Sequence, residues 1–468
     1  MMSNHYTQAF EILLTQNKIR IGDKLIFGAN KSSEDLHAVV KENGIEIDGV
    51  THSLTSGACY LMKKQGYLHP VNGWLIWYTE AGRLLSSLYK ECVGIQGEDF
   101  DQRIAFKEYT HHFSPNRQAL FFFGAGVSYS DGAPLQADLL KLVLNPANEL
   151  IQSLEIQMEL QDIIRENFYI NEVDGVYPSL ENIFSFFDYF ILYNESLSRR
   201  YNNAKLHKLK HHLIKIIFMA VNDATSRSSE NFDKFWKLIY STSTNISIAT
   251  LNYDTLPEDA FALLYPLNCY LDFCTELANY DYFKITSKYH WINPQSTILC
   301  NPNNPPFICK FIKLHGSLNW YYCNCCNNLL VQPWDRSKLF LFDNADTIDS
   351  LRCQYDGSEY SALITPPSYI KNLTHPIIES MLIEFTNEVR KADRLVFVGY
   401  SLPEADWHIK AILAKADMRN KKVVVINPFI TDFIRRRFLG VCKDCEFVSL
   451  SFQDLVNDKE LFQNIIAG

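Results

Sequence analysis

The sequence has 468 residues, 47% hydrophobic and 21% charged, with a formal net charge of −9. This composition excludes a largely disordered protein and provides apolar mass for about two or three domains. The negative balance excludes a uniformly basic, nucleic-acid-binding surface, although it leaves room for a local basic patch.

The first residues predict no secretory signal. The chain begins MMSNHYTQAF, with no basic segment followed by an apolar one, and apolar runs such as LIKIIFMAV at 213–221 are short and interrupted by lysine. We therefore expect a soluble, cytoplasmic protein. Its 12 cysteines are then predicted to be reduced thiols or metal ligands, not a disulfide framework.

Residues 1–95 are predicted to form a small α+β domain. KLIFGA at 24–29 and IEIDGV at 45–50 have the alternation of strands, and HSLTSGACYLMKKQGY at 52–67 is typical of a helix with a serine near its start. A turn at Asn72-Gly73, an aromatic strand and a second helix follow.

This N-terminal segment resembles the RAMA domain, a small domain associated with restriction enzymes and adenine methylases. Gly49, the Ser53-Leu54-Thr55 to Ala58 stretch, Asn72-Gly73-Trp74 and Trp77 carry the resemblance. A DNA-reading role is not supported by charge, since residues 1–95 hold nine basic and nine acidic side chains. Trp74 and Trp77 could stack on a base or a ligand, but we expect them to be core aromatics.

Residues 96–117 are polar and read as a linker, and residues 118–468 alternate strands with helices. This alternation predicts an α/β fold with a Rossmann-like, doubly wound, mostly parallel sheet. The predicted strands are ALFFFGAG, ISIATLNYD, FIKLHGSL, RLVFVGYS and KVVVINP.

Residues from about 135 to 240 are predicted to be a helical insertion that acts as a lid or an interaction layer. One face of its last long helix is apolar at helical spacing. The residues of this face are Leu206, Leu209, Leu213, Ile216 and Ile217.

The stretch FFFGAGVSYS at 121–130 ends a buried strand with two glycines. Glycine there allows backbone N–H groups to approach a pyrophosphate, and a following helix would present its positive end to the same charge. The spacing of Gly124, Gly126 and Gly132 is not that of the common dinucleotide fingerprint, so the signal is weak alone.

Polar residues follow three other predicted strands. They lie in Thr250-Leu251-Asn252-Tyr253-Asp254, Lys313-Leu314-His315-Gly316-Ser317 and Gly399-Tyr400-Ser401-Leu402-Pro403. The carboxyl ends of parallel strands form the crevice of an open α/β sheet, so we expect these residues to converge.

The order Gly-Ala-Gly-x-Ser, Thr-x-Asn-x-Asp, His-Gly, Gly-x-Ser, Ile-Asn resembles the sirtuin-like NAD-binding family across about residues 118 to 450. The resemblance implies that Asn252, His315 and Asp254 are catalytic. It also implies that NAD is held by Gly124, Ala125, Gly126, Ser128, Gly132, Thr250, Gly316, Gly399, Ser401 and Asn427.

Two features differ from protein-deacylating sirtuins. Their Gly-Ile-Pro-x-Phe-Arg loop is replaced by Gly132-Ala133-Pro134-Leu135-Gln136, and their two Cys-x-x-Cys pairs by Cys323, Cys325, Cys326 and a distant Cys353. Adjacent cysteines suit tetrahedral zinc poorly, so no metal is expected. Both departures resemble the bacterial branch that hydrolyses NAD in antiphage defence, where GYSLPEAD is a familiar motif.

Cleaving the nicotinamide–ribose bond develops positive charge on the ribose and needs a positioned water. Asn252 could hold that water, His315 could accept a proton, and Asp254 could either add charge or cap a helix. The leading hypothesis is a latent NAD+ hydrolase; the alternatives are an NAD-dependent deacylase or ADP-ribosyltransferase, and a non-catalytic NAD or ADP-ribose sensor. We also expect homo-oligomers and an activating protein or nucleic acid acting through the N-terminal domain.

Overall fold

A computed structural model describes residues 5–28, 36–96, 106–110, 112–144, 154–243, 245–278, 290–331, 352–353, 355–371 and 373–467. The chain forms two compact units. Unit 1 contains Met1–Pro115, Glu230–Ile246 and Pro257–Phe311, and unit 2 contains Asn116–Ser229, Ser247–Leu256 and Ile312–Gly468. None of the described helices combines the length and apolar character needed to cross a bilayer.

The N-terminal segment folds around a five-stranded antiparallel sheet with the order β4-β3-β2-β1-β5. Its elements are α1 (His5–Thr15), β1 (Lys24–Phe27), β2 (His37–Lys41), β3 (Gly44–Ile47), β4 (Val50–His52), α2 (Leu54–Lys64), the 3-10 helix η1 (Gly73–Leu75), β5 (Trp77–Thr79) and α3 (Leu85–Cys92). The predicted turn at Asn72 thus opens a 3-10 helix ahead of the aromatic strand, because the Asn72 side chain accepts the Trp74 amide.

Core packing accounts for both tryptophans of this segment. Trp74 is 3% exposed and Trp77 is fully buried, with its indole N–H donated to the Leu54 carbonyl at 2.9 Å. The prediction of core aromatics is confirmed, and neither ring presents a face to a DNA base. The buried Asn72 and Thr55 side chains bond to the Tyr265 carbonyl and hydroxyl within unit 1.

An eight-stranded sheet with the order β10-β9-β12-β8-β7-β16-β17-β18 confirms the predicted α/β class. The registered pairs of this sheet are parallel. Its strands are β7 (Arg117–Phe123), β8 (Ile246–Thr250), β9 (Cys269–Asp272), β10 (Trp291–Ile292), β12 (Phe307–Lys313), β16 (Ala392–Val398), β17 (Lys422–Ile426) and β18 (Cys445–Val448). All five strand segments predicted from the sequence belong to it.

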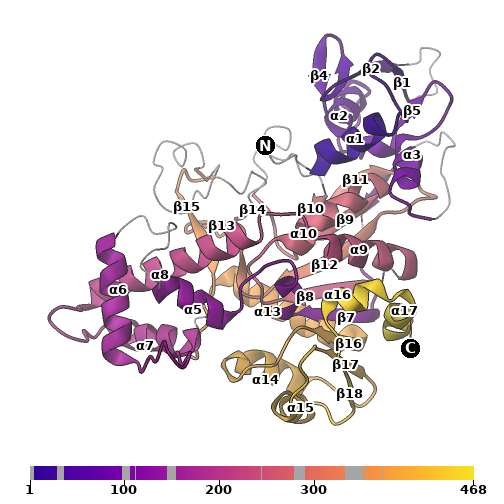
Figure 1. The fold of residues 1–468 in the computed structure, drawn as a ribbon. Coiled ribbons are helices and arrows are strands. Elements are labelled where there is room, and N and C mark those ends of the chain that lie inside the picture. Colours follow the sequence, from indigo (N-terminus) through magenta and orange to yellow (C-terminus); the bar gives the residue numbers. More distant parts are fainter. Residues whose placement is uncertain are drawn as a thin grey trace. The chain divides into compact units, whose positions relative to one another are not determined.

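The strand order reverses around β7, which has β8 on one side and β16 on the other. Such a reversal is the switch point at which open α/β sheets form their crevice. Within unit 2, β7, β16 and β17 lie side by side (Figure 1). A buried Arg117–Glu388 ion pair of 2.8 Å ties the start of β7 to α13 (Pro376–Lys391).

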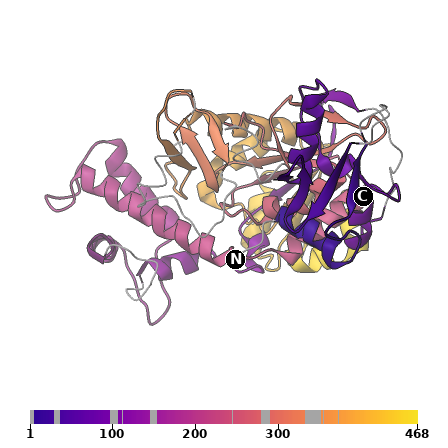
Figure 2. The same cartoon turned by 90° about the horizontal axis from the view of Figure 1, so that it is seen from above.

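Consecutive helices confirm the predicted insertion (Figures 1 and 2). Those in unit 2 are α5 (Gln136–Leu144), α6 (Leu154–Asn167), α7 (Leu180–Leu192) and α8 (Asn203–Ala224), and they share a hydrophobic core. The short α4 (Gly126–Tyr129) precedes the insertion, and α9 (Glu230–Thr242) lies in unit 1. The five apolar positions predicted for one face of α8 are all buried.

Smaller sheets and further helices complete the described chain. β6 (Lys107–Thr110) pairs with β11 (Thr297–Cys300), and β13 (Gly316–Cys323) pairs with β14 (Leu329–Val331) and β15 (Tyr360–Ile364). The remaining elements are α10 (Leu256–Phe261), η2 (Ala262–Leu267), η3 (Glu404–Asp406), α14 (Trp407–Lys415), α15 (Asp432–Leu439), α16 (Phe452–Asn457) and α17 (Lys459–Ala467).

Candidate active site

A cavity of about 510 Å³ lies in unit 2 where β7, β8, β12, β16 and β17 end. Its size is that of a small-molecule or cofactor site. Of the residues singled out in the sequence, the structure brings ten to its lining: Gly124, Ala125, Gly126, Ser128, Asn252, Asp254, His315, Gly399, Ser401 and Asn427. We call these ten residues the strand-end wall. Gly132, Thr250 and Gly316 lie outside the lining.

The glycines of this wall allow two backbone segments to touch. A Cβ on Gly124 would lie 2.5 Å from the Gly399 carbonyl oxygen, and one on Gly399 would lie 2.6 Å from the Gly126 carbonyl carbon. Gly399 also has φ +61°, a conformation that favours glycine. The contact between the loops after β7 and β16 is therefore enough to exclude side chains at these glycines, whether or not a phosphate binds there.

The amides of these glycines are already engaged. Gly124 N–H donates to the Val398 carbonyl and Gly126 N–H to the Gly399 carbonyl, each at 3.0 Å. These two N–H groups are therefore not free donors for a phosphate. The helix expected after the glycines is α4, a single turn of four residues, which carries only a small part of the dipole of a long helix.

Asn252 is held by hydrogen bonds on two sides. Its side-chain NH2 donates to the Gly124 carbonyl at 3.0 Å and lies 3.4 Å from the Ser128 hydroxyl oxygen. Thr250, just behind the wall, accepts the Asn252 amide at 3.0 Å and donates its hydroxyl to the Phe123 carbonyl at 3.1 Å. The side-chain amide of Asn252 is thereby oriented, and its oxygen makes no hydrogen bond with any residue that the structure describes.

Asp254 is engaged through both carboxylate oxygens. One accepts the Leu256 amide at 3.2 Å at the start of α10, and the other accepts the Ser128 hydroxyl at 2.9 Å. The helix-capping alternative considered for this residue is therefore present in the structure. The side chain is 3% exposed, so its charge reaches the cavity mainly through Ser128.

His315 is a buried imidazole on the cavity lining. Its ring is 5% exposed, and Nε2 has no hydrogen-bond partner within the described part of the chain. Burial, followed by the charge of Lys371 and the neighbouring His408, holds the pKa of His315 well below its usual value. An uncharged ring nitrogen can accept a proton near neutral pH.

Three residues beside His315 were missed in the sequence. Lys371 donates to the Ala405 carbonyl at 2.8 Å and pairs with Asp406, which also accepts the Tyr400 hydroxyl at 3.0 Å. The ring centroids of His315 and His408 are 5.5 Å apart. Asp406 and His408 follow the Gly399–Pro403 stretch and could have been found from it, whereas Lys371 lies in a loop without a motif.

His315, Asp406 and His408 lie close enough to ligate one ion, with their potential ligand atoms within 4.8 Å of one another. However, both Asp406 oxygens are already bonded, one of them to the Lys371 ammonium group. A metal cation would have to displace that ammonium group or lie beside it in a buried space, which makes this trio a poor metal site.

The helical insertion supplies a second, mostly apolar side of the cavity. We call it the insertion wall, and it consists of Leu139 of α5, Leu180 and Glu181 of α7, and Ile217 and Val221 of α8. Four of the five are aliphatic and belong to the core of the insertion. Glu181 is the only charged member.

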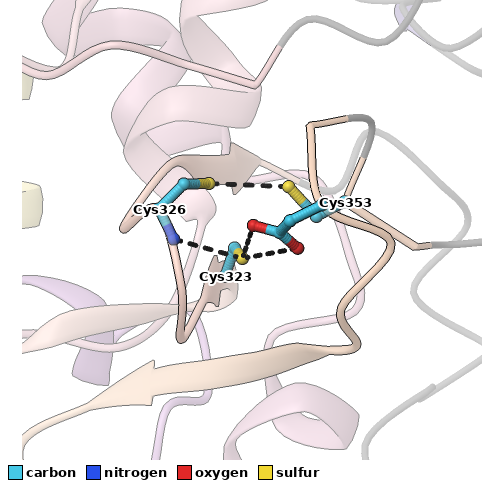
Figure 3. Close-up of side chains that lie close together, drawn as sticks. Cys323, Cys326 and Cys353 are labelled. Carbon is cyan, nitrogen blue, oxygen red and sulfur yellow. Dashed lines mark hydrogen bonds between the residues drawn. The ribbon is translucent and has the colours of Figure 1, made fainter.

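The cysteines after His315 form a separate cluster (Figure 3). Cys326 Sγ lies 3.5 Å from Cys353 Sγ, and Cys323 Sγ lies 3.2 Å from an Asp356 carboxylate oxygen. The four ligand atoms all lie within 4.8 Å of one another. Cys325 is exposed, and its thiol lies 3.2 Å from the Ser358 hydroxyl.

The cluster consists of two similar turns, Cys323-x-x-Cys326 and Cys353-x-x-Asp356. In each turn, the backbone carbonyl of the first cysteine accepts a hydrogen bond from the backbone N–H four residues later in the chain. The backbone N–H of the same cysteine donates to the carbonyl five residues later. Zn–S bonds of about 2.3 Å place tetrahedral thiolates ~3.8 Å apart, close to the separations found here. Three cysteines and a carboxylate are thus spaced as zinc ligands would be, with Cys323 and Cys326, not the adjacent Cys325 and Cys326, forming the first pair. The expectation that the protein holds no metal stays a prediction.

No family model matches the sequence, and no curated protein matches it. Among solved structures, the fold is similar to that of Sir2Tm bound to a propionylated peptide, with 13% identity, 75% of this chain and 94% of that chain covered, and a TM-score of 0.36. A mutant Sir2 homologue in complex with ADP-ribose is 15% identical, with 75% of this chain and 93% of that chain covered and a TM-score of 0.34. A Sir2–p53 peptide–NAD+ structure is 15% identical, with 73% of this chain and 91% of that chain covered and a TM-score of 0.33. The likeness is distant, so the case for a site rests on this chain's own residues.

Proposed function

We propose that the protein is a sirtuin-like NAD+ hydrolase, which cleaves the nicotinamide–ribose bond to give nicotinamide and ADP-ribose. The observation that carries this proposal is the meeting of the oriented Asn252 amide and the neutral His315 ring in one cavity. Five ordered motifs, far apart in the sequence, supply the strand-end wall of that cavity.

The reaction breaks the bond between ribose C1 and the pyridinium nitrogen, and the electron pair goes to the nitrogen. Water then forms the new bond to C1 and loses one proton, so the products are nicotinamide, ADP-ribose and H⁺. The transition state is oxocarbenium-like, as in glycoside hydrolysis. A catalyst has to position the water and take up its proton.

The two residues suit these two tasks. The Asn252 side-chain oxygen can accept a hydrogen bond from the water or from a ribose hydroxyl, while its NH2 group stays anchored to Gly124. A neutral amide does not capture the cation as a carboxylate could. The His315 imidazole, whose pKa burial lowers, is the proposed acceptor for the released proton, and Ser128 links Asn252 to the charge of Asp254.

We further propose a latent effector of the bacterial antiphage type that depletes NAD when activated. Uncontrolled NAD+ hydrolysis would harm the cell that makes the enzyme, so control is required. The helical insertion and the RAMA-like N-terminal segment are the candidate regulatory parts. Stacking of DNA bases on the segment's tryptophans is not part of this proposal, because both rings are buried.

Nicotinamide release from NAD+ by the purified protein, with and without phage lysate, tests the activity. We expect Asn252→Ala and His315→Ala to lose at least about 100-fold in rate, while His207→Ala, on the exposed face of α8, retains it. Turnover that requires an added acyl-lysine peptide would identify a deacylase instead, and label transferred to protein would identify an ADP-ribosyltransferase. Full activity in both site variants would refute the assignment.

A further inference from the structure

Glu181 lies on the cavity lining, with most of its side chain buried and its carboxylate open to the cavity. It is 8% exposed, and it makes no hydrogen bond or ion pair with any residue that the structure describes. Burying a carboxylate without a partner is costly, and proteins usually avoid it. A group facing a ligand-sized cavity in this way is suited to receive its partner from the ligand.

The helix dipole does not explain this burial. Glu181 lies in the first turn of α7, where a negative charge is favourable, but Ser179 already caps the helix by accepting the Asn182 amide. Glu155 occupies the first turn of α6 in the same insertion and is exposed to solvent. A favourable charge at a helix start therefore requires no burial.

Glu181 shares its chamber with the catalytic motif. The Tyr253 phenol donates to the Thr365 carbonyl at 2.6 Å, and burial together with the charges of Asp406 and Glu181 raises the pKa of Tyr253. Glu181 and Tyr253, the residue that follows Asn252, line the same cavity. The other members of the insertion wall surround it with aliphatic surface.

This combination matches one end of NAD+. The diphosphate is anionic and is repelled by a carboxylate, and adenine is neutral. The nicotinamide ring is flat, apolar on its faces and positively charged, and its carboxamide carries two N–H donors. We propose, on the basis of the proposed function, that Glu181 is a specificity-determining residue that receives the cationic nicotinamide group and orients NAD+ with its phosphates toward the strand-end wall.

The charge on the ring sets how Glu181 affects the rate. When the bond to ribose breaks, the ring becomes neutral and its attraction to Glu181 falls. Glu181 therefore stabilises bound NAD+ more than the transition state, so its loss raises KM and leaves kcat unchanged or higher. NADH has an uncharged dihydropyridine ring, and ADP-ribose has no ring, so neither gains from the carboxylate charge.

Calorimetry of ligand binding tests the proposal. The ligands are NAD+, NADH and ADP-ribose, and the two proteins compared are the Asn252→Ala variant and the double variant that also carries Glu181→Gln. We expect Glu181→Gln to weaken NAD+ about 10-fold or more and to change ADP-ribose less than about 2-fold, so that the preference for NAD+ over NADH shrinks. Glu155→Gln in the same background is the matched first-turn control and should change none of the three. In the active protein, Glu181→Gln should raise KM for NAD+ and not lower kcat.

Equal weakening of all three ligands would mean that Glu181 only supports the fold, and unchanged NAD+ binding would also overturn the proposal. A selective loss of NAD+ binding in a protein that never releases nicotinamide would leave the role of Glu181 intact and refute the hydrolase assignment. If none of the three ligands binds to the unsubstituted protein either, both proposals fail.

Discussion

The two walls of the cavity are built on different principles. The strand-end wall contains three glycines whose backbone makes close contacts, the Asn252 amide held by the Gly124 carbonyl, and the His315 imidazole. The insertion wall is aliphatic, apart from Glu181, and its residues pack as an ordinary helical core. The activity should therefore depend on which residues form the strand-end wall, and mainly on the side-chain volume of the residues in the insertion wall.

Conservative substitutions on the two walls should have opposite outcomes. Asn252→Asp removes the donor to the Gly124 carbonyl, sets a carboxylate oxygen against that carbonyl oxygen, and introduces a group that can capture the ribose cation in place of water. We therefore expect nicotinamide release to fall about 100-fold or more. Ile217→Leu keeps volume and should leave the rate within about 3-fold, at a stability cost below about 1.5 kcal/mol. Steady-state kinetics compare the two, and equal losses would remove the distinction between the walls.

Disturbing the contact between Gly399 and Gly126 should lower the stability of the protein. Gly399→Ala adds a Cβ 2.6 Å from the Gly126 backbone at a positive φ, whereas Gly82→Ala, at φ +80°, meets no atom within 4 Å. We expect a loss of about 3 kcal/mol for Gly399→Ala and about 1 kcal/mol for Gly82→Ala in denaturant unfolding. A Gly399 variant no less stable than the Gly82 variant would show that the loops after β7 and β16 do not touch.

The cysteine cluster is a further region in which residue identity should matter more than volume, because its spacing fits a zinc ion. We expect the purified protein to hold about one zinc per chain, measured by atomic emission, and Cys323→Ser to abolish it. Asp356→Ala should weaken zinc about 10- to 100-fold, while Cys325→Ser, outside the cluster, should have no effect. Full zinc content in Cys323→Ser would refute the assignment of ligands.

The smallest expected effect is on the pH dependence of stability. Burial, followed by Lys371, lowers the pKa of His408 to about 4, so the folded state stays neutral between about pH 4 and 6.5 while the unfolded state takes up a proton. Stability should therefore fall as pH drops below about 6.5, by up to about 1.4 kcal/mol per pH unit for this proton, and level off above it. His408→Gln should flatten that slope in unfolding measured from pH 7 to 5, and an unchanged slope would contradict the assignment.

The order of the strands and the residues at their ends could be read from the sequence because both are local signals. A buried apolar run followed by Gly124, Asn252 or His315 marks a strand and its loop, and parallel strands place such loops at one edge. The neighbouring residues do not reveal why Gly124 and Gly126 must be glycines. Gly124 and Gly126 are constrained by Gly399, more than 270 positions away, and only the paired strands show that contact.

By itself, the sequence determined the α/β class, the insertion and the residues of the strand-end wall, because hydrophobic periodicity and strand-end chemistry are carried by neighbouring residues. Tertiary structure alone decided that Glu181 and Lys371 line the cavity, and that Asp356 completes a cluster with three cysteines. Each of these side chains stands in a segment without a motif. Its role comes from the burial and the partners that folding imposes, and neither is encoded by its immediate neighbours in the chain.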